Sequence, residues 1–270
     1  MEYLAGCLHM NIRLNKEKSI GKVLYIVEGG KTEPYLLYKI FCNIMDYQME
    51  TILREKGYHK YNSKQNPTSQ VFVINAEESN IKNIDKDNEF LNRLFTELIE
   101  NYDFNVDNAA IYYIFDRDNQ SNTDPEFIWE MLSVLADSRD NDTERQGLLL
   151  LSYPSIEAFT LSNFVDQSFK LQFDTGSRLK QYLHEHNINH SSITKDTLIH
   201  AAQELIDAID EMNLGELDID AFGECNRKIF EYEENEYEQE ALYKALSLLC
   251  VSLMDLGVIE VIHEMHEQDG

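Results

Sequence analysis

The chain has 270 residues, 43% of them hydrophobic, and contains only 4 prolines and 11 glycines. This composition predicts one or two folded domains and excludes disordered, collagen-like and low-complexity classes. The formal net charge of −26, from 49 acidic and 23 basic residues, excludes a protein that coats DNA uniformly, because phosphate contacts require clustered lysine and arginine.

The charge is distributed unevenly. Residues 1–75 hold 10 basic and 7 acidic residues, whereas residues 200–270 hold 3 and 19. A nucleic-acid surface would therefore be confined to the N-terminal third, unless a partner supplies positive charge or the chain binds no nucleic acid. Four scattered cysteines without a CxxC pair indicate a reduced, cytoplasmic protein. Neither a signal peptide nor an apolar run of the ~18 residues needed for a membrane helix is present, so no membrane association is expected.

Apolar strands alternate with amphipathic helices over residues 20–165. Thr32 and Pro34 fit the first turn of the first helix. Strands are predicted at 22–27, 71–75, 109–115 and 147–151, helices at about 32–56, 89–102 and 125–136 and from 155, and a loop at 57–68. This alternation predicts an α/β fold with a parallel sheet covered by helices on both faces.

No strand is predicted beyond about residue 170, where helices are expected at 177–188, 196–213, 219–236 and 238–266. The prediction is thus an α/β domain over residues 1–168 and an acidic, all-α subdomain over 169–270. The glutamates of 231–240 are interpreted as a solvated face, or else as a docking surface for a basic partner. The apolar residues between 246 and 262 suggest a helix in the core or in a homo-oligomer interface.

Carboxylates follow three of the four predicted strands. Glu28 follows the first, Asp116 and Asp118 follow the third, and Glu157 lies one turn into the helix after the fourth. These positions map to one sheet edge, where sites form in parallel α/β folds. Carboxylates placed this close together repel one another. A shared Mg²⁺ or Mn²⁺, which prefers hard oxygen ligands, can offset that repulsion. Taken singly, each carboxylate is more typical of a helix cap or a turn.

Three short segments resemble a known family. They are EGGKTEP (28–34), DRD (116–118) and SYPSIE (152–157). Their order and positions resemble the TOPRIM domain of topoisomerases, primases and OLD-family nucleases, and most closely the RloB-like proteins of bacterial anti-phage defence. The third segment departs from that family's S-N-P-C-F-E at Tyr153 and Ser155, and Asn163 stands where the family often has a histidine.

The resemblance implies a TOPRIM-like fold and metal-dependent phosphodiester hydrolysis of RNA, including tRNA, or of DNA. It implies that Glu28 acts as acid/base or organises the metal, that Asp116 and Asp118 hold Mg²⁺, and that Glu157 completes the site. Lys31 would contact the scissile phosphate, or else be a solvated surface lysine. Glu33 is interpreted as a helix N-terminal charge. Related systems imply a toxic effector controlled by an ATPase partner.

A basic segment with interleaved aromatic residues is the candidate nucleic-acid surface because it lies in the one third of the chain that is not acidic; taken by itself, it is more typical of a solvated loop after a helix. Its residues are Arg54, Lys56, Tyr58, His59, Lys60, Tyr61 and Lys64.

Two other functions remain open. The chain could be a non-catalytic acidic regulatory or docking subunit, or it could transfer nucleotides, for which the sequence offers little support. The eight histidines, including His184, His186 and His190, show no close metal-ligand spacing.

Overall fold

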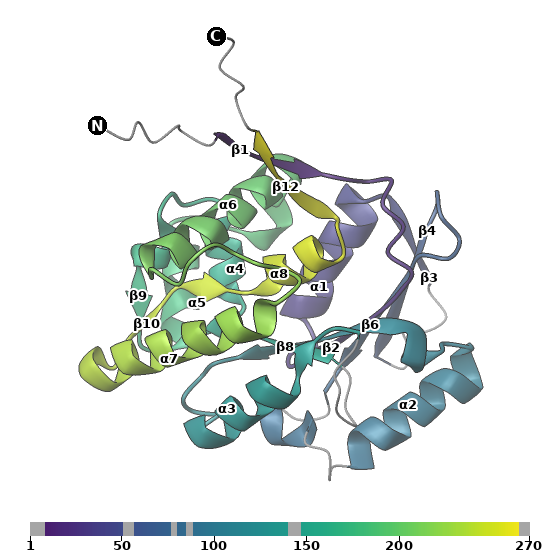
Figure 1. The fold of residues 1–270 in the computed structure, drawn as a ribbon, viewed down its shortest axis with the longest axis horizontal. Helices are drawn as coiled ribbons and strands as arrows, with labels where there is room; N and C mark the ends of the chain where they lie inside the picture. The colour runs from purple at the N-terminus through teal and green to yellow at the C-terminus, as the bar shows by residue number, and fades with distance from the viewer. Residues whose placement is uncertain (1–8, 51–56, 77–79, 85–88, 140–146, 265–270) are drawn as a thin grey trace, which may run out of the picture.

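The computed structural model describes residues 9–50, 57–76, 80–84, 89–139 and 147–264, and its centre is a mixed sheet of eight strands (Figure 1). The strand order is β11-β8-β6-β2-β5-β4-β3, with β7 paired to β8 beside this path. Its strands are β2 (Lys22–Val27), β3 (Tyr47–Glu50), β4 (Tyr58–Ser63), β5 (Gln70–Asn75), β6 (Ala109–Asp116), β7 (Ala136–Asp137), β8 (Gly147–Tyr153) and β11 (Leu246–Ser247).

The four central strands, β5-β2-β6-β8, are parallel, as the alternating pattern predicts. Their side chains are buried on both faces, which explains the continuous apolar runs. The flanking strands β3, β4, β7 and β11 are antiparallel, so the sheet as a whole is mixed rather than purely parallel.

Helices cover both faces of the sheet. In Figure 1, α2 and α3 lie on one side, and α1, α4, α6 and α8 lie on the other. Among the helices of the described residues, none combines the length and the hydrophobicity of a transmembrane span. The α-helices are α1 (Thr32–Tyr38), α2 (Glu89–Tyr102), α3 (Pro125–Val134), α4 (Glu157–Ser162), α5 (Gly176–Glu185), α6 (Lys195–Glu211), α7 (Phe222–Glu240) and α8 (Leu249–Asp255).

Shorter helical segments join these elements. A π-helix, η1 (Lys39–Ile44), continues α1. The 3₁₀ segments are η3 (Ile81–Ile84), η4 (Val106–Asn108), η5 (Ser168–Lys170) and η6 (His190–Ser192).

Two predictions for the N-terminal third are wrong. The helix predicted to reach residue 56 ends at Ile44, and β3 follows it. The predicted loop 57–68 contains strand β4, which pairs with β3 and β5. The strand is polar because it lies toward the antiparallel end of the sheet, where one face can remain partly exposed. Only Tyr61 in it is fully buried.

The predicted all-α C-terminal subdomain is also wrong. In place of one helix over 238–266, the chain forms β10 (Tyr243–Lys244), β11, α8 and β12 (Ile259–Glu264), and β9 (Gln172–Phe173) pairs with β10. Gly257, with φ of 66°, ends the apolar helix. Strand β11 extends the main sheet beside β8, and one cluster of buried side chains includes both Leu151 and Leu253.

A second, two-stranded sheet brings distant parts of the chain together. Strand β1 (His9–Leu14) pairs with β12 in antiparallel register, from His9 opposite Glu264 to Leu14 opposite Ile259. In Figure 1 this pair lies beside α6.

Candidate active site

The carboxyl ends of adjacent strands β2 and β6 place Glu28 and Asp116 next to each other. The backbone N–H of Glu28 donates to the carbonyl of Ile114 (3.0 Å), and the N–H of Asp116 donates to Glu28 Oε2 (2.8 Å). Asp116 Oδ1 in turn accepts from the N–H of Ile156, at the entry to α4 (2.7 Å). Each carboxylate is therefore fixed through one oxygen by the backbone of the neighbouring strand or loop.

Glu33 brings a third carboxylate to the same place. It lies in the first turn of α1 and is 5% exposed, and its Oε1 accepts from the N–H of Gly29 (2.8 Å). A Cβ at position 29 would collide with the Glu33 carboxylate, so a larger residue there would displace Glu33 from this contact. The interpretation of Glu33 as a helix N-terminal charge agrees with its place in the first turn of α1, but it does not anticipate the buried position of the side chain beside the strand ends.

Glu157 completes the group from the first turn of α4. Its Oε2 accepts from Ser155 Oγ (2.8 Å), and its Oε1 lies 3.4 Å from Lys180 Nζ on α5. The four carboxylates line one open cleft of about 420 Å³ together with Lys180 and Lys31. The strand-end argument thus correctly brings Glu28, Asp116 and Glu157 to one edge of the sheet.

The carboxylates of this cleft perturb one another. Burial raises the pKa of Glu28 to about 7, with the charges of Glu33 and Asp118 adding to the rise and the Asp116 N–H opposing it. Burial, then the charges of Glu28, Glu33 and Glu157, raise the pKa of Asp116 well above its usual range. Burial also raises the pKa of Glu33. A bound cation or a retained proton would relieve this concentration of negative charge.

Two of the predicted catalytic residues take more peripheral positions. Lys31 lines the cleft but is exposed, which leaves its ammonium free to meet an entering anion. Asp118 belongs to a turn: its Oδ1 accepts from Gln120 N–H (2.8 Å), and its carbonyl accepts from the N–H groups of Ser121 and Asn122. It does not line the cleft, although its charge acts on Glu28.

The ligand atoms of Glu28, Asp116 and Asp118 do not form a compact set in the described structure. Among the residues it covers, the three whose ligand atoms all lie within 4.8 Å of one another are Asp166, His200 and Glu204. This does not conflict with magnesium at the cleft, because Mg²⁺ is usually held by only one or two carboxylates and keeps several waters.

The candidate nucleic-acid surface is less available than its sequence suggests. Lys60 pairs with Glu50 (3.0 Å) and Lys64 pairs with Asp46 (2.5 Å). Tyr61 is fully buried, so it cannot stack on a base. Arg54 and Lys56 lie outside the described residues.

The C-terminal acidic and apolar residues are partly internal. Glu233 is fully buried and Glu234 pairs with Arg117, so the glutamates of α7 are not uniformly a solvated face. The apolar residues of α8 are buried within the chain's own core, where they are unavailable to an oligomer interface.

Sequence reasoning missed Lys180 altogether and discounted Glu33. Lys180 lies on α5, beyond the three resembling segments, and no local pattern marks it. The position of Glu33 could have been predicted from the sequence. It stands five residues after Glu28, and the connection between them contains two glycines. A connection this short can return a side chain to the end of the strand.

In comparisons with known proteins, no family model, curated protein or solved structure matches the chain.

Proposed function

We propose that this protein is a metal-dependent phosphodiester hydrolase with a TOPRIM-like active-site edge, acting on RNA or DNA. The observation that carries the proposal is the pair Glu28 and Asp116, which meet at the ends of adjacent parallel strands with Glu33 and Glu157 on the same cleft. The order and position of the three resembling segments support the same reading.

The donor set fits a hard divalent cation. Glu28 and Asp116 each have one oxygen fixed by a backbone N–H, which orients the other oxygen without using it. We assign Mg²⁺ or Mn²⁺ to Glu28 and Asp116, with Glu157 as a further candidate ligand and Asp118 acting through its charge. When bound, such an ion supplies Lewis acidity and lowers the pKa of a coordinated water.

The chain's own residues then have separate tasks. The two lysines of the cleft offer positive charge to phosphate oxygens, Lys180 from a position 3.4 Å from Glu157 and Lys31 from the exposed rim. Because the chain carries −26 overall, these local cations would bring a polyanion to an otherwise repulsive surface.

The test is a cleavage assay on single-stranded RNA, tRNA and DNA with the full-length protein in Mg²⁺, Mn²⁺ and EDTA. Glu28→Gln and Asp116→Asn are expected to lower the cleavage rate by roughly 10²-fold or more. Glu238→Gln, on the exposed end of α7, is the matched control and should leave the rate unchanged. Cleavage that persists in EDTA or in Asp116→Asn would refute the proposal.

The biological setting follows from the resemblance: a toxic effector of an anti-phage system, restrained by an ATPase partner. Expression of the wild type in bacterial cells is then expected to stop growth, and expression of Asp116→Asn is not. Growth arrest of equal strength by both would instead favour the alternative of a non-catalytic acidic docking subunit, which the charge of −26 supports.

A further inference from the structure

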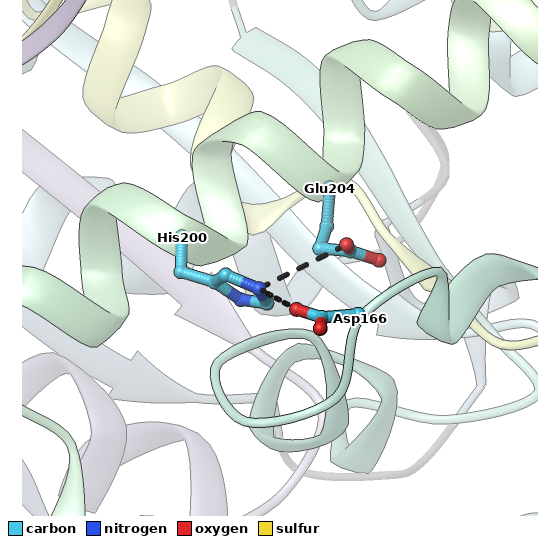
Figure 2. Close-up of side chains that lie close together, drawn as sticks. All are labelled: Asp166, His200 and Glu204. Carbon is cyan, nitrogen blue, oxygen red and sulfur yellow. Dashed lines mark hydrogen bonds and ion pairs between the residues drawn. The ribbon is translucent and has the colours of Figure 1, made fainter.

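A second cluster of polar side chains lies away from the cleft, between α6 and the loop that follows α4. His200 and Glu204 are one turn apart on the same face of α6, and Asp166 approaches them from the loop (Figure 2). His200 Nε2 is 2.9 Å from Asp166 Oδ1 and 4.0 Å from Glu204 Oε1. One imidazole nitrogen therefore faces two carboxylates.

The other imidazole nitrogen is already committed. His200 Nδ1 lies 2.7 Å from the carbonyl oxygen of Ser162. Because a carbonyl can only accept, Nδ1 must carry a proton and donate it. With no cation between them, Nε2 also carries a proton and donates it to Asp166 Oδ1; once that proton is lost, the Nε2 lone pair faces the carboxylates and can bind a cation placed between them. A backbone carbonyl that fixes the tautomer in this way is a frequent partner of metal-binding histidines.

The Glu204 carboxylate is held by the loop that carries Asp166. Its side chain is 7% exposed, its Oε1 accepts from Gln167 N–H (2.9 Å), and its Oε2 accepts from the N–H (2.7 Å) and the hydroxyl (3.0 Å) of Ser168. These bonds join Glu204 to the two residues that follow Asp166, so they position these two carboxylates relative to each other.

We propose that Asp166, His200 and Glu204 form a binding site for a divalent transition-metal ion, and we expect Zn²⁺ to be the ion that binds most tightly. One imidazole nitrogen with two carboxylates is a nitrogen-oxygen donor set suited to Zn²⁺ and poorly suited to Mg²⁺. The Asp166 side chain is 95% exposed, so water can occupy the remaining coordination position. This site is independent of the proposed hydrolase and would join α6 to the end of α4.

The experiment is a competition titration of the full-length protein against a zinc indicator, with Mg²⁺ as the comparison ion. Asp166→Asn keeps the shape of an exposed side chain, and both it and His200→Gln should weaken Zn²⁺ binding by at least about tenfold. His184→Gln, an exposed histidine on α5, is the matched control and should bind as the wild type does. Circular dichroism in EDTA establishes that each variant is folded. Zn²⁺ that binds at the strand-end cleft is the same in all variants, so it does not contribute to the difference between them.

Imidazole nitrogen NMR provides a readout that a purely structural role would not move. Zn²⁺ should shift the His200 Nε2 resonance while Nδ1 keeps its proton. The proposal is overturned if the wild type does not bind one equivalent of Zn²⁺ tightly. It is also overturned if both folded variants bind Zn²⁺ as the wild type does. In either case the cluster is only an ion pair between a histidine and carboxylates. If the variants lose Zn²⁺ binding but keep nuclease activity, the proposed function is unaffected. If the wild type binds Zn²⁺ at this site but has no nuclease activity, the zinc site is unaffected.

Discussion

Arg117, between the two aspartates at the end of β6, is bound side-on by Glu234 of α7. Nε and Nη2 of Arg117 donate to Glu234 Oε1 (2.8 Å) and Oε2 (2.7 Å), and Nη1 donates to the carbonyl of Asn122 (2.6 Å). The arginine side chain is 1% exposed. Helix α7 thus holds the segment that carries Asp116 in place.

Removing one partner of this pair is expected to be costly. Arg117→Ala should lower the free energy of unfolding by ~3–5 kcal/mol, because Glu234 is left uncompensated and a buried side chain is lost. Urea denaturation measures this. Arg13→Ala provides the control, since its pair with Glu260 is exposed and should contribute less than about 1 kcal/mol. Equal losses in both variants would mean that the Arg117 pair is no more than a surface contact.

Neutralising Asp116 should stabilise the metal-free protein. Asp116→Asn keeps Oδ1 to accept from Ile156 N–H but removes one charge from a cleft it shares with Glu28. At pH 8 in EDTA we expect a gain of ~1–2 kcal/mol in the free energy of unfolding. Mg²⁺ should then raise the melting temperature of the wild type but not of the variant. Asp174→Asn, at an exposed position, should show neither change, and a destabilised Asp116→Asn would argue against charge crowding.

The two glycines of the turn after β2 should differ in how well they tolerate a larger side chain. Gly29→Ala forces the buried Glu33 carboxylate to move, because the added Cβ would lie 2.4 Å from its Oε2. We expect a loss of ~1–3 kcal/mol in stability, the cost of breaking a buried contact. Gly30→Ala meets only Asn75 Nδ2 at 3.8 Å, an ordinary contact. The two variants can be compared by thermal melting, and a Gly30→Ala loss as large as that of Gly29→Ala would contradict the role assigned to Glu33.

Glu233 makes stability depend on pH. Burial raises the pKa of Glu233 to about 8 from an ordinary 4.5. Among the described residues, Lys244 donates its N–H to Glu233 Oε2 (3.0 Å), and none donates to Oε1. The folded chain therefore retains a proton that the unfolded chain releases above about pH 4.5. The associated stability is complete below that pH and is lost as pH rises through about 8.

Glu233→Gln imitates the protonated carboxyl and should remove this dependence. The variant's advantage over the wild type is expected to grow between about pH 5 and pH 8 by several kcal/mol, at ~1.36 kcal/mol per pKa unit. Urea denaturation at a series of pH values measures the difference, with Glu238→Gln on the exposed side of α7 as the control. A difference that is constant with pH would show that Glu233 is ionised in the folded chain.

The sequence predicts the parallel half of the fold well because each buried strand there is a continuous apolar run ending at a polar turn. Strands β2, β5, β6 and β8 and helix α2 are found close to where periodicity places them. The antiparallel strands are missed for two physical reasons. Strand β4 is polar because it is only half-buried, and the apolar run around α8 reads equally well as helix or strand.

The candidate site divides in the same way. Strand topology alone brings Glu28 to Asp116, since carboxyl ends of neighbouring parallel strands share an edge. Lys180 depends on how α5 packs against α4, which no local pattern encodes. His200 and Glu204 do have a readable spacing of four residues on one helix face, but their third partner, Asp166, comes from a loop whose path only tertiary structure defines.

The ladder between β1 and β12 also determines how the molecule would respond to a mechanical load. His9 faces Glu264 at the end of the ladder nearest both termini, and Leu14 faces Ile259 at the far end. Tension applied between the termini would open the pairs one after another, starting at His9, instead of shearing all six together. A pulling experiment should therefore release β1 and β12 at low force while the central sheet stays intact.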